Sequence, residues 1–537
     1  MNESKTMKGV FLREATGLVR EYGWFDCFWI VSLGFGSSIL TGLAFYCSYY
    51  PVSGLDGIPW LSILITLGLS FFVYWPILQM SVAMPRSGGD YVFVSRTIHP
   101  AIGFMNNFAF TIAALIGIGI SVPWILSLGL TAPLYLVGIQ TGNTGLSGIA
   151  ALVSQPWAAF ALGTLILLII LIVNTFGSSA IKLFNRFQFA VFVIGFALVI
   201  WFLASYRTSD FLAAFNSLAP QTGVTVDKVF EIAKATGWHP PNYSVQGTLP
   251  QLPIAMFSFY GASFSAYFAG EVKNIRRTQP VATLVFMFSS AIGWIVLMLL
   301  TYNFFGDQFF TAVSWVSFGP GAAQNPWPLL MSPNALIFIL NVPAQLLFNI
   351  LMIINWVQWF LFFWMASTRN MFAWAFDRVF PERFARVNER FKSPVLAAAT
   401  VFIGAEIFQY LFVFTPLFTG QFNFLLFLTS CLIIPNIAAA VFPYRKRDMY
   451  NAAPSVVKMK VGPIPLITIL GTLGALVMVW LTYTMLLLPF LGPANLAAFA
   501  FFFGIYAAGL VVFFISWAVR KGQGLDMSKI FQEIPPE

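Results

Sequence analysis

The sequence predicts an all-α polytopic membrane protein with about twelve transmembrane helices. The chain has 537 residues, of which 59% are hydrophobic and only 9% are charged, and its mean hydropathy is +0.82. A soluble domain has roughly 45–50% apolar and about 25% charged residues. Its apolar runs continue over about 20 residues without alternation, which is typical of membrane helices and unlike β-barrel strands. This composition excludes soluble enzymes, nucleic-acid-binding proteins, disordered chains and disulfide-rich secreted domains.

Twelve apolar runs are long enough to cross the hydrocarbon core, which takes about 20 residues each. Two of them, 101–137 and 335–365, exceed one crossing, so we expect these helices to tilt or to extend past the headgroups. The predicted spans lie near 28–50, 60–84, 101–137, 157–176, 182–205, 250–271, 280–305, 335–365, 395–414, 422–442, 464–488 and 497–519.

The distribution of basic residues predicts the orientation. Of the 28 Lys and Arg residues, three (Arg207, Lys228 and Lys234) lie in one set of alternate loops, which leaves 25 for the other loops and the two termini. Cytoplasmic loops are enriched in Lys and Arg, so both termini are predicted to be cytoplasmic in a multi-pass protein of the plasma membrane. The net charge of +9 then indicates contact with the lipid bilayer and its anionic lipids, with no nucleic-acid partner.

No cofactor is predicted. Cys27, Cys47 and Cys431 all lie in apolar runs and give no disulfide framework. His99 and His239 are far apart in the sequence, and neither has a cysteine or carboxylate at metal-ligand spacing. We therefore expect no metal site. If the protein uses a coupling ion, the sequence does not decide between H⁺ and Na⁺.

The spans and loops divide the chain into six parts. The long outward segment includes a glycosylation acceptor pattern at Asn242, whose use the sequence leaves open. The parts are a cytoplasmic N-terminal segment 1–27, a first five-helix repeat 28–205, an extracellular loop 206–249, a second five-helix repeat 250–442, two additional transmembrane helices 464–519 and a cytoplasmic tail 520–537.

Small and polar residues interrupt the middle of two spans. In the first span they surround Gly36, Ser37 and Ser38, and in the sixth they surround Gly261 and Ser263. Glycine weakens a helix by about 1 kcal/mol relative to alanine, and unpaired backbone at membrane depth is tolerated only where it lines a cavity or is buried in protein. Close packing of helices through small residues is the alternative explanation for either segment alone.

The two interruptions occupy corresponding spans of the two five-helix halves. Paired interruptions of this kind indicate a transporter site between inverted repeats, with helices 1 and 6 discontinuous. A broken helix exposes N–H groups to an anionic group and carbonyl groups to a cation. A zwitterion with a carboxylate and an ammonium group suits both.

Three motifs resemble one transporter family. Gly36-Ser37-Ser38-Ile39 is similar to Gly-x-Gly-Ile. The run from Pro85 to Tyr91 (Pro-Arg-Ser-Gly-Gly-Asp-Tyr) resembles Pro-x-Ser/Ala-Gly-Gly-x-Tyr. Phe259-Tyr260-Gly261, followed by Glu271-Val272-Lys273-Asn274, resembles Phe-x-Gly-x-Glu followed by Glu-x-x-Asn-Pro. These are motifs of the amino acid–polyamine–organocation (APC) superfamily of amino acid permeases, with a LeuT-type fold of five plus five inverted spans and two additional ones. With the hydropathy pattern, the resemblance covers residues 20–520.

The resemblance implies a substrate site. Ser37, Ser38 and the adjoining backbone would hold the substrate carboxylate, and the carbonyl groups of 257–261 would hold its amine. Phe257 would be an aromatic gate above the substrate with Tyr260 nearby, although packing is the alternative role of Phe257. The predicted substrate-binding residues are Gly36, Ser37, Ser38, Ile39, Phe257, Tyr260, Gly261, Ala262 and Ser263.

Charged residues near the cytoplasmic surface are candidates for an inner gate. Arg86 and Asp90 could pair across the Gly88-Gly89 turn, with Asp90 capping a short helix that starts at Tyr91. Glu271 would form a charged end to the sixth span. The alternatives are a solvated turn and a plain interfacial anchor.

The sequence departs from the family pattern at sites that bear on the substrate and the ion. Ser38 replaces the second glycine, and Ser263 stands where many members have glutamate. Glu406 is the carboxylate near the middle of an apolar span, so it is a candidate for proton coupling. A structural role within the bundle is the alternative. Asn355 could reach a sodium ion, although interhelical hydrogen bonding is the alternative.

We therefore expect a secondary active transporter, not an enzyme, that moves an amino acid or related amine by alternating access. A polyamine or other organic cation transporter or exchanger is the alternative. A channel would favour a continuous pore lining, and an integral membrane enzyme would need clustered His, Asp or Glu at one face. The sequence does not decide whether the protein is a monomer or a homodimer.

Overall fold

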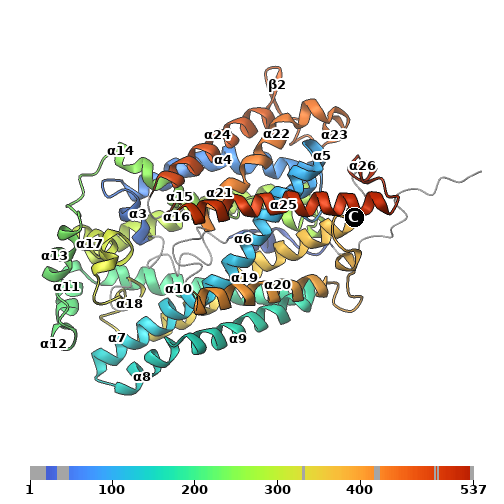
Figure 1. Ribbon diagram of the computed structural model, residues 1–537. Coiled ribbons are helices and arrows are strands. Elements are labelled where there is room, and N and C mark those ends of the chain that lie inside the picture. The colour runs from blue at the N-terminus through green and yellow to red at the C-terminus, as the bar shows by residue number, and fades with distance from the viewer. Residues whose placement is uncertain are drawn as a thin grey trace, which may run out of the picture.

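The computed structural model describes residues 20–32, 47–328, 333–415, 424–488, 491–492 and 495–532. The predicted site residues Gly36, Ser37, Ser38 and Ile39 lie outside these described residues. Almost all of the regular structure within them is helical, and the one sheet is a hairpin of β1 (Lys460–Val461) and β2 (Ile464–Pro465) (Figure 1). The predicted all-α polytopic fold is confirmed.

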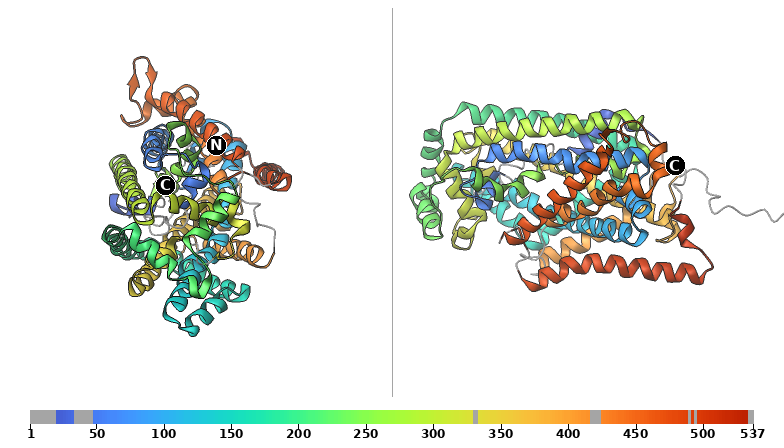
Figure 2. Two further views of the ribbon diagram at one scale, coloured as in Figure 1. Left: turned by 90° about the vertical axis from the view of Figure 1, so that its left-hand side faces the viewer. Right: turned by 90° about the horizontal axis from the view of Figure 1, so that it is seen from above.

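In the described residues, ten helical segments are long and apolar enough to cross a membrane. They lie side by side and share one general direction (Figure 2), and each overlaps one predicted span. They are α4 (Pro59–Ala83), α6 (Pro100–Leu126) continued by the π-helix η3 (Ser127–Thr131) and α7 (Ala132–Thr141), α9 (Pro156–Thr175), α10 (Gly177–Ser205), α16 (Ile275–Phe305), α19 (Val342–Phe376), α20 (Val395–Phe414), α21 (Phe424–Cys431) with α22 (Ile433–Arg445), α24 (Leu466–Leu487) and α25 (Leu496–Gly522).

The remaining two predicted spans are those in which the sequence predicts an interruption. The segment 250–271 is not one helix: α15 (Leu252–Phe257) is followed by turns, then by the short 3₁₀ segments η5 (Phe264–Tyr267) and η6 (Ala269–Glu271). Only the two ends of 28–50 are described, as α1 (Trp24–Val31) and α3 (Ser48–Ser53). The predicted break in the sixth span is therefore present.

The predicted span 335–365 differs most in its bounds. We expected a helix over 335–365, but α19 begins at Val342 and continues to Phe376. The Asn341 side chain caps its first turn by accepting a hydrogen bond from the Ala344 N–H at 3.0 Å, while α18 (Pro333–Leu336) is a separate short helix. The longer C-terminal part brings Arg369, which lies beyond the predicted end of this span, into the helix.

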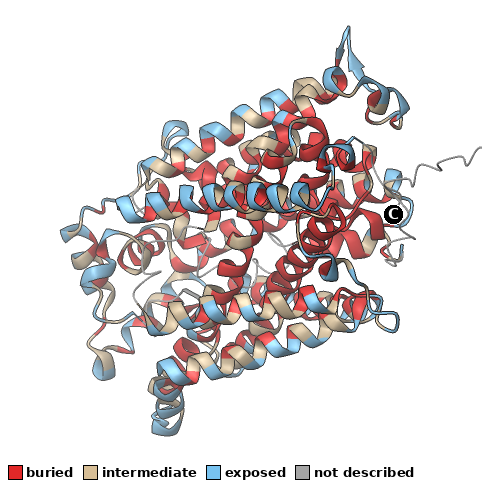
Figure 3. Cartoon of the chain, turned by 45° about the vertical axis from the view of Figure 1, so that its right-hand side comes forward, coloured by how far each residue is buried: buried red, intermediate tan, exposed pale blue. Residues whose placement is uncertain are grey.

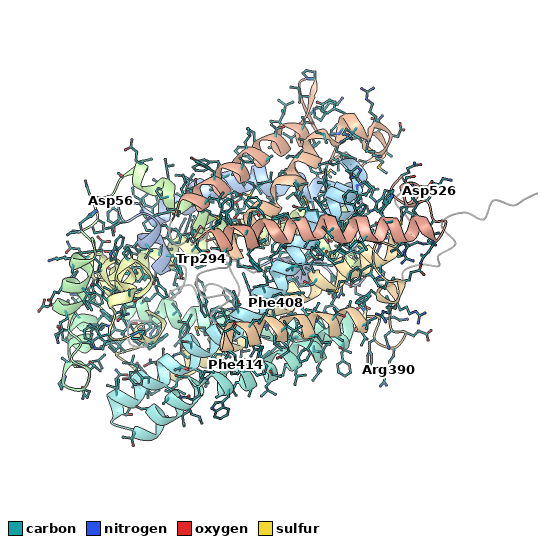
Figure 4. The ribbon with its side chains drawn as sticks, viewed as in Figure 1. Asp56, Trp294, Arg390, Phe408, Phe414 and Asp526 are labelled. Carbon is teal, nitrogen blue, oxygen red and sulfur yellow. The ribbon has the colours of Figure 1, made fainter. Side chains whose placement is uncertain are left out.

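The bundle has two distinct ends (Figure 1). The tail end holds most of the Lys- and Arg-rich loops, and the loop end holds the long segment between α10 and α15. Figure 4 shows Asp56 at the loop end, with Arg390 and Asp526 at the tail end. At the tail end lie α5 (Asp90–Thr97), α23 (Arg447–Ala452) and α26 (Met527–Ile530); at the loop end lie α11 (Thr208–Asn216), α12 (Ala219–Thr222), α13 (Val226–Ala235), α14 (Val245–Thr248) and α17 (Asp307–Phe318).

Burial separates central from peripheral helices. The segment 252–271 is buried throughout, and most of α6 and α19 is buried with it. By contrast, α9, α20, α24 and α25 expose large apolar side chains along their outer faces (Figure 3). Apolar side chains on the outside of a bundle are stable in contact with lipid. The broken span is therefore enclosed by protein on its sides.

Gly119 tests the close packing of α6 against α20. A Cβ atom there would lie 2.6 Å from the Ala405 carbonyl oxygen and 2.8 Å from the Gln409 nitrogen, and backbone atoms cannot move aside as a flexible side chain can. We predict that Gly119→Val lowers the free energy of unfolding by about 1–3 kcal/mol, measured by thermal unfolding in detergent. Gly504→Val is the matched control, because a Cβ at Gly504 meets no atom within 4 Å. Equal melting temperatures of the two variants would contradict this packing.

Candidate functional site

The backbone of the sixth span unwinds immediately after Phe257. Gly261 has a φ of +118°, a conformation that side chains with a Cβ rarely adopt. Hydrogen bonds between residues three apart replace the helical pattern: the Tyr260 N–H donates to the Phe257 carbonyl at 3.1 Å, and the Phe264 N–H donates to the Gly261 carbonyl at 2.8 Å. We call 258–263 the unwound segment.

Hydroxyl groups of α16 satisfy two carbonyl groups of the unwound segment. Ser290 Oγ donates to the Ser258 carbonyl at 2.6 Å, and Thr283 Oγ1 donates to the Ala262 carbonyl at 3.0 Å. Within the described part of the chain, no donor bonds to the Tyr260 carbonyl, whereas each of the other carbonyl groups over 257–263 accepts one hydrogen bond. A buried carbonyl costs free energy unless it finds a donor. The Tyr260 carbonyl is therefore the acceptor most available to a ligand.

Aromatic side chains surround the unwound segment. Phe257 is buried, with its ring centroid 5.6 Å from that of Trp359 on α19 and 5.8 Å from that of Tyr260. The Tyr260 hydroxyl is hydrogen-bonded to the hydroxyl of Thr429 on α21. Phe257, Tyr260, Ala262 and Ser263 are all buried. The structure thus brings these predicted site residues together with α19 and α21. Together they form a largely aromatic and uncharged environment.

The first span meets this region through α1. The Gln358 side-chain amide of α19 donates to the Trp29 carbonyl near the end of α1, at 2.5 Å. The Ser32 hydroxyl, one residue beyond the helix, donates to the Phe28 carbonyl at 2.5 Å. The described end of α1 is therefore anchored to α19, which also contacts Phe257. The motif from Gly36 to Ile39 follows outside the described residues.

A buried ion pair lies at the tail end of the sixth span. Arg369 Nε donates to Glu271 Oε1 at 2.9 Å and its Nη2 donates to Oε2 at 3.0 Å, with each side chain only 2% exposed. This fork-to-fork geometry is the strong form of an arginine–carboxylate pair. Glu271 therefore pairs with α19 and is not the simple interfacial anchor that was our alternative. Sequence reasoning missed Arg369 as its partner, because the polar run from Ser367 to Asn370 interrupts the apolar pattern. The apolar run from Met371 to Phe376 that follows is the signal for a longer helix.

Backbone hydrogen bonds attach the segment before α1 to this ion pair. The Glu21 and Tyr22 N–H groups donate to the Glu271 carbonyl at 2.9 and 3.0 Å, and the Lys273 N–H donates to the Tyr22 carbonyl at 2.9 Å. Lys182 Nζ of α10 lies 2.6 Å from Glu21 Oε2, and this hydrogen bond lowers the pKa of the Glu21 carboxyl. The start of the first span, the end of the sixth span, α10 and α19 are thus tied together at the tail end.

Asp90 has other partners than the Arg86 that the sequence suggested. Its carboxylate accepts hydrogen bonds from Asn106 and Asn107 of α6, at 2.7 and 2.8 Å, and from the Tyr267 hydroxyl at 3.1 Å. The Arg86 guanidinium lies over the Phe376 ring, 4.7 Å from its centroid. Asp90 is also the first residue of α5 and not its N-cap, because its side chain points into this network and Gly89, at φ +58°, precedes the helix.

A second buried ion pair lies at the same end. Arg96 of α5 contacts Asp377, just after α19, with Nη1 to Oδ2 at 2.7 Å and Nη2 to Oδ1 at 2.8 Å. The Phe531 ring covers the Arg96 guanidinium at 5.3 Å from its centroid. No sequence pattern indicated that these residues meet, because they are separated by 281 positions.

The two ion-coupling candidates form hydrogen bonds with neighbouring helices. Glu406 Oε2 on α20 accepts a hydrogen bond from Thr164 of α9 at 3.0 Å. The Asn355 amide on α19 donates to the Gln188 carbonyl of α10 at 3.3 Å. Their roles in ion coupling stay predictions. Among the described residues, no group of three or more His, Cys, Asp or Glu could hold a metal ion.

These features define a class of protein: a multi-pass helical membrane protein with a broken, buried span and a network of ion pairs and hydrogen bonds at one end, as in secondary transporters. The family described as "Amino acid permease" matches residues 22–516. The chain belongs to this family, within the APC superfamily. A comparison with curated proteins found no match. The protein is therefore a membrane transporter of amino acids or amines, and the family implies transport and not catalysis.

The Glu271–Arg369 pair yields a stability prediction. Glu271→Gln leaves the Arg369 guanidinium buried without its counter-charge, so we expect a loss of about 3–5 kcal/mol in unfolding free energy, measured by thermal or denaturant unfolding in detergent. Glu382→Gln is the matched control. Glu382 lies 3.9 Å from Arg378 and is 51% exposed, so its loss is expected to stay below about 1 kcal/mol. Similar losses in the two variants would show that the buried pair contributes no more than an exposed one.

Proposed function

We propose that this protein is a secondary active transporter that carries an amino acid or related amine across the plasma membrane by alternating access. The substrate binds at the bilayer midplane, between the unwound parts of spans 1 and 6, with α6 and α19 as walls. The observation that supports this most is the unwound segment itself, which is buried among the central helices and retains one carbonyl, that of Tyr260, without a donor in the described residues.

The two halves of a zwitterion have different partners in this proposal. The substrate ammonium group donates to the Tyr260 carbonyl, three residues beyond the C-terminal end of α15, and the C-terminal end of a helix favours a cation. The substrate carboxylate accepts hydrogen bonds from Ser37, Ser38 and their backbone. The segment 252–263 contains no charged residue, so the site favours a substrate whose own charges balance.

Alternating access requires that the two ends open in turn. In the described conformation, the tail end is closed by the Glu271–Arg369 pair and by the hydrogen bonds from Glu21 and Tyr22. We propose that this end is cytoplasmic, because it holds most of the Lys- and Arg-rich loops. Breaking these contacts would release substrate inward, while Phe257 closes the site on the other side.

A polyamine or other organic cation is the alternative substrate. Such a cation requires carboxylates to balance its charges, and the unwound segment has Ser263 where many family members have glutamate. A zwitterion therefore suits the segment better. A thermal-shift screen of the purified protein against the common amino acids and polyamines, at two pH values and with and without sodium, distinguishes these classes, because a ligand that binds the folded state raises its melting temperature.

Ser38→Leu tests the site in the first span. The larger side chain would fill the space that the substrate carboxylate needs, so we expect substrate affinity to fall by about a hundredfold or more, measured by thermal shift and by uptake into proteoliposomes. Gly504→Leu is the control, because it adds the same side chain where a Cβ meets no atom within 4 Å. Wild-type affinity in Ser38→Leu would place the substrate elsewhere.

Phe257→Ala tests the proposed gate. Removing the ring opens the space between Trp359 and Tyr260, so bound substrate should dissociate roughly tenfold faster, with most of the change in the dissociation rate. Retention of radiolabelled substrate by the purified protein measures this. Phe414→Ala removes an exposed ring on the outer face of α20 (Figure 4) and should retain substrate normally. Equal retention of substrate by the two variants would show that Phe257 is a packing residue and not a gate.

A further inference from the structure

Asp90 is a buried carboxylate that the proposed transport site does not use. Its residue is 5% exposed, and its two oxygens accept three hydrogen bonds, all from neutral donors: Asn106, Asn107 and Tyr267. The buried carboxylates of Glu271 and Asp377, by contrast, each pair with an arginine. Burying a charge without a counter-charge is costly, and such a group gains from taking up a proton.

Burial raises the pKa of the Asp90 carboxyl, and the hydrogen bonds from Asn106, Asn107 and Tyr267 act in the opposite direction. The other titratable groups beside it are the Cys431 thiol and the Tyr506 hydroxyl. Of the helices packed against α5, α4 and α6 carry no charged side chain, α22 carries only Arg445, which is exposed, and α19 carries Arg369. The buried charged groups around Asp90 have partners of their own. These are Arg96 with Asp377 and Arg369 with Glu271, while the guanidinium of Arg86 in the preceding loop lies over Phe376.

The surroundings of Asp90 can hold either protonation state. With Asp90 ionised, the Tyr267 hydroxyl donates to Oδ1. With Asp90 protonated, the carboxyl O–H can donate to the same phenol oxygen, because a tyrosine hydroxyl both donates and accepts. Rotation of one hydroxyl hydrogen is enough to accommodate the proton, and no heavy atom has to move.

The same tyrosine connects Asp90 to the broken span. Tyr267 ends η5, four residues after the unwound segment, and its carbonyl accepts a hydrogen bond from the Gly88 N–H at 3.0 Å. Its ring stacks on Phe110 of α6, with centroids 4.7 Å apart. A Cβ at Gly89 would lie 2.5 Å from this ring. Protonation of Asp90 weakens its bond to Tyr267 and so loosens the contact of α5 and α6 with the inner half of span 6.

A small pocket joins Asp90 to the unwound segment. Asp90, Ser263 and Tyr267 supply the side-chain oxygens of its lining, which is otherwise mostly apolar. A metal cation would need a fuller shell of oxygen ligands, whereas a proton needs one acceptor. The remaining lining residues are Ile77, Phe110, Phe264, Ala266, Leu428, Cys431, Leu432 and Pro435.

We propose that Asp90 is the proton-binding site that couples substrate transport to a proton gradient. This inference rests on the proposed transport function and names its driving ion. The Asp90 carboxylate takes up a proton in the state open to the outside, and the carboxyl returns it to the cytoplasm after the tail end opens. Tyr267 is a positioning residue, because it transmits the charge of Asp90 to span 6.

The test separates coupling from transport. Purified protein is reconstituted in proteoliposomes with an equimolar mixture of the radiolabelled common L-amino acids. Exchange is measured with amino acids on both sides at equal pH, and accumulation is measured under an inward proton gradient. The wild-type protein should do both. Asp90→Asn mimics the protonated state, so it should keep exchange and lose accumulation driven by the pH gradient. Glu406→Gln neutralises the rival candidate on α20 and should keep both if Asp90 is the proton site. Glu382→Gln, which neutralises a half-exposed carboxylate, is the control.

Tyr267→Phe gives a second readout that does not depend on the folding of Asp90→Asn. It keeps the ring that stacks on Phe110 and removes the hydroxyl that donates to the carboxylate. Hydrogen bonds to a charged acceptor are the stronger ones, so the net effect favours the protonated form. The midpoint of the pH dependence of accumulation should move to higher pH by about half to one unit. A purely structural tyrosine would lower the rate without moving this midpoint.

The outcomes are distinct. Accumulation retained by Asp90→Asn, or lost in Glu406→Gln alone, overturns the assignment. If Asp90→Asn loses exchange as well, an unmoved midpoint in Tyr267→Phe overturns it and a raised midpoint supports it. Wild-type exchange without accumulation under a proton gradient, or accumulation driven by sodium alone, overturns proton coupling and leaves the transport function intact. Absence of any exchange in the wild-type protein removes the transport function and this inference with it.

Discussion

The unsatisfied backbone of an interrupted membrane helix is the constraint on which the rest of the structure depends. No water in the hydrocarbon region can pair with freed N–H and carbonyl groups, so the sixth span can unwind only inside the protein. The structure meets this requirement with bonds between residues three apart, with the hydroxyls of Ser290 and Thr283, and with burial among α6, α16 and α19. Of the carbonyl groups over 257–263, that of Tyr260 alone has no donor among the described residues, and it is where we propose that the substrate amine binds.

A second constraint concerns charge. The buried charged side chains of the tail end include the guanidinium groups of Arg96 and Arg369 and the carboxylates of Asp90, Glu271 and Asp377. Two carboxylates have an arginine each, and their bidentate geometry offsets the loss of hydration. The third, Asp90, has neutral partners that also contact span 6. The arrangement thus distinguishes two carboxylates that are paired with arginine from one without a counter-charge, which is the carboxylate that we propose takes up the coupling proton.

Much of the fold could be predicted from the sequence, because hydropathy and the positions of glycine and serine reflect local physics. The ten long spans and the break after Phe257 followed from these patterns. The partner of Glu271 did not, because pairing across the bundle depends on three-dimensional packing and Arg369 lies beyond the predicted end of its span. The charges of Arg86 and Asp90 suggested a pair, but side-chain direction is set by the Gly88-Gly89 turn and by α6, which the sequence does not specify. The residues from Gly36 to Ile39 remain a prediction.

An experimental structure of the protein with a bound amino acid tests the central claim most directly. The account predicts that the substrate ammonium lies about 3 Å from the Tyr260 carbonyl oxygen, with the substrate carboxylate against Ser37 and Ser38 and the sixth span unwound over 258–263. A substrate bound elsewhere, or a sixth span that is one continuous helix when substrate is present, would contradict it.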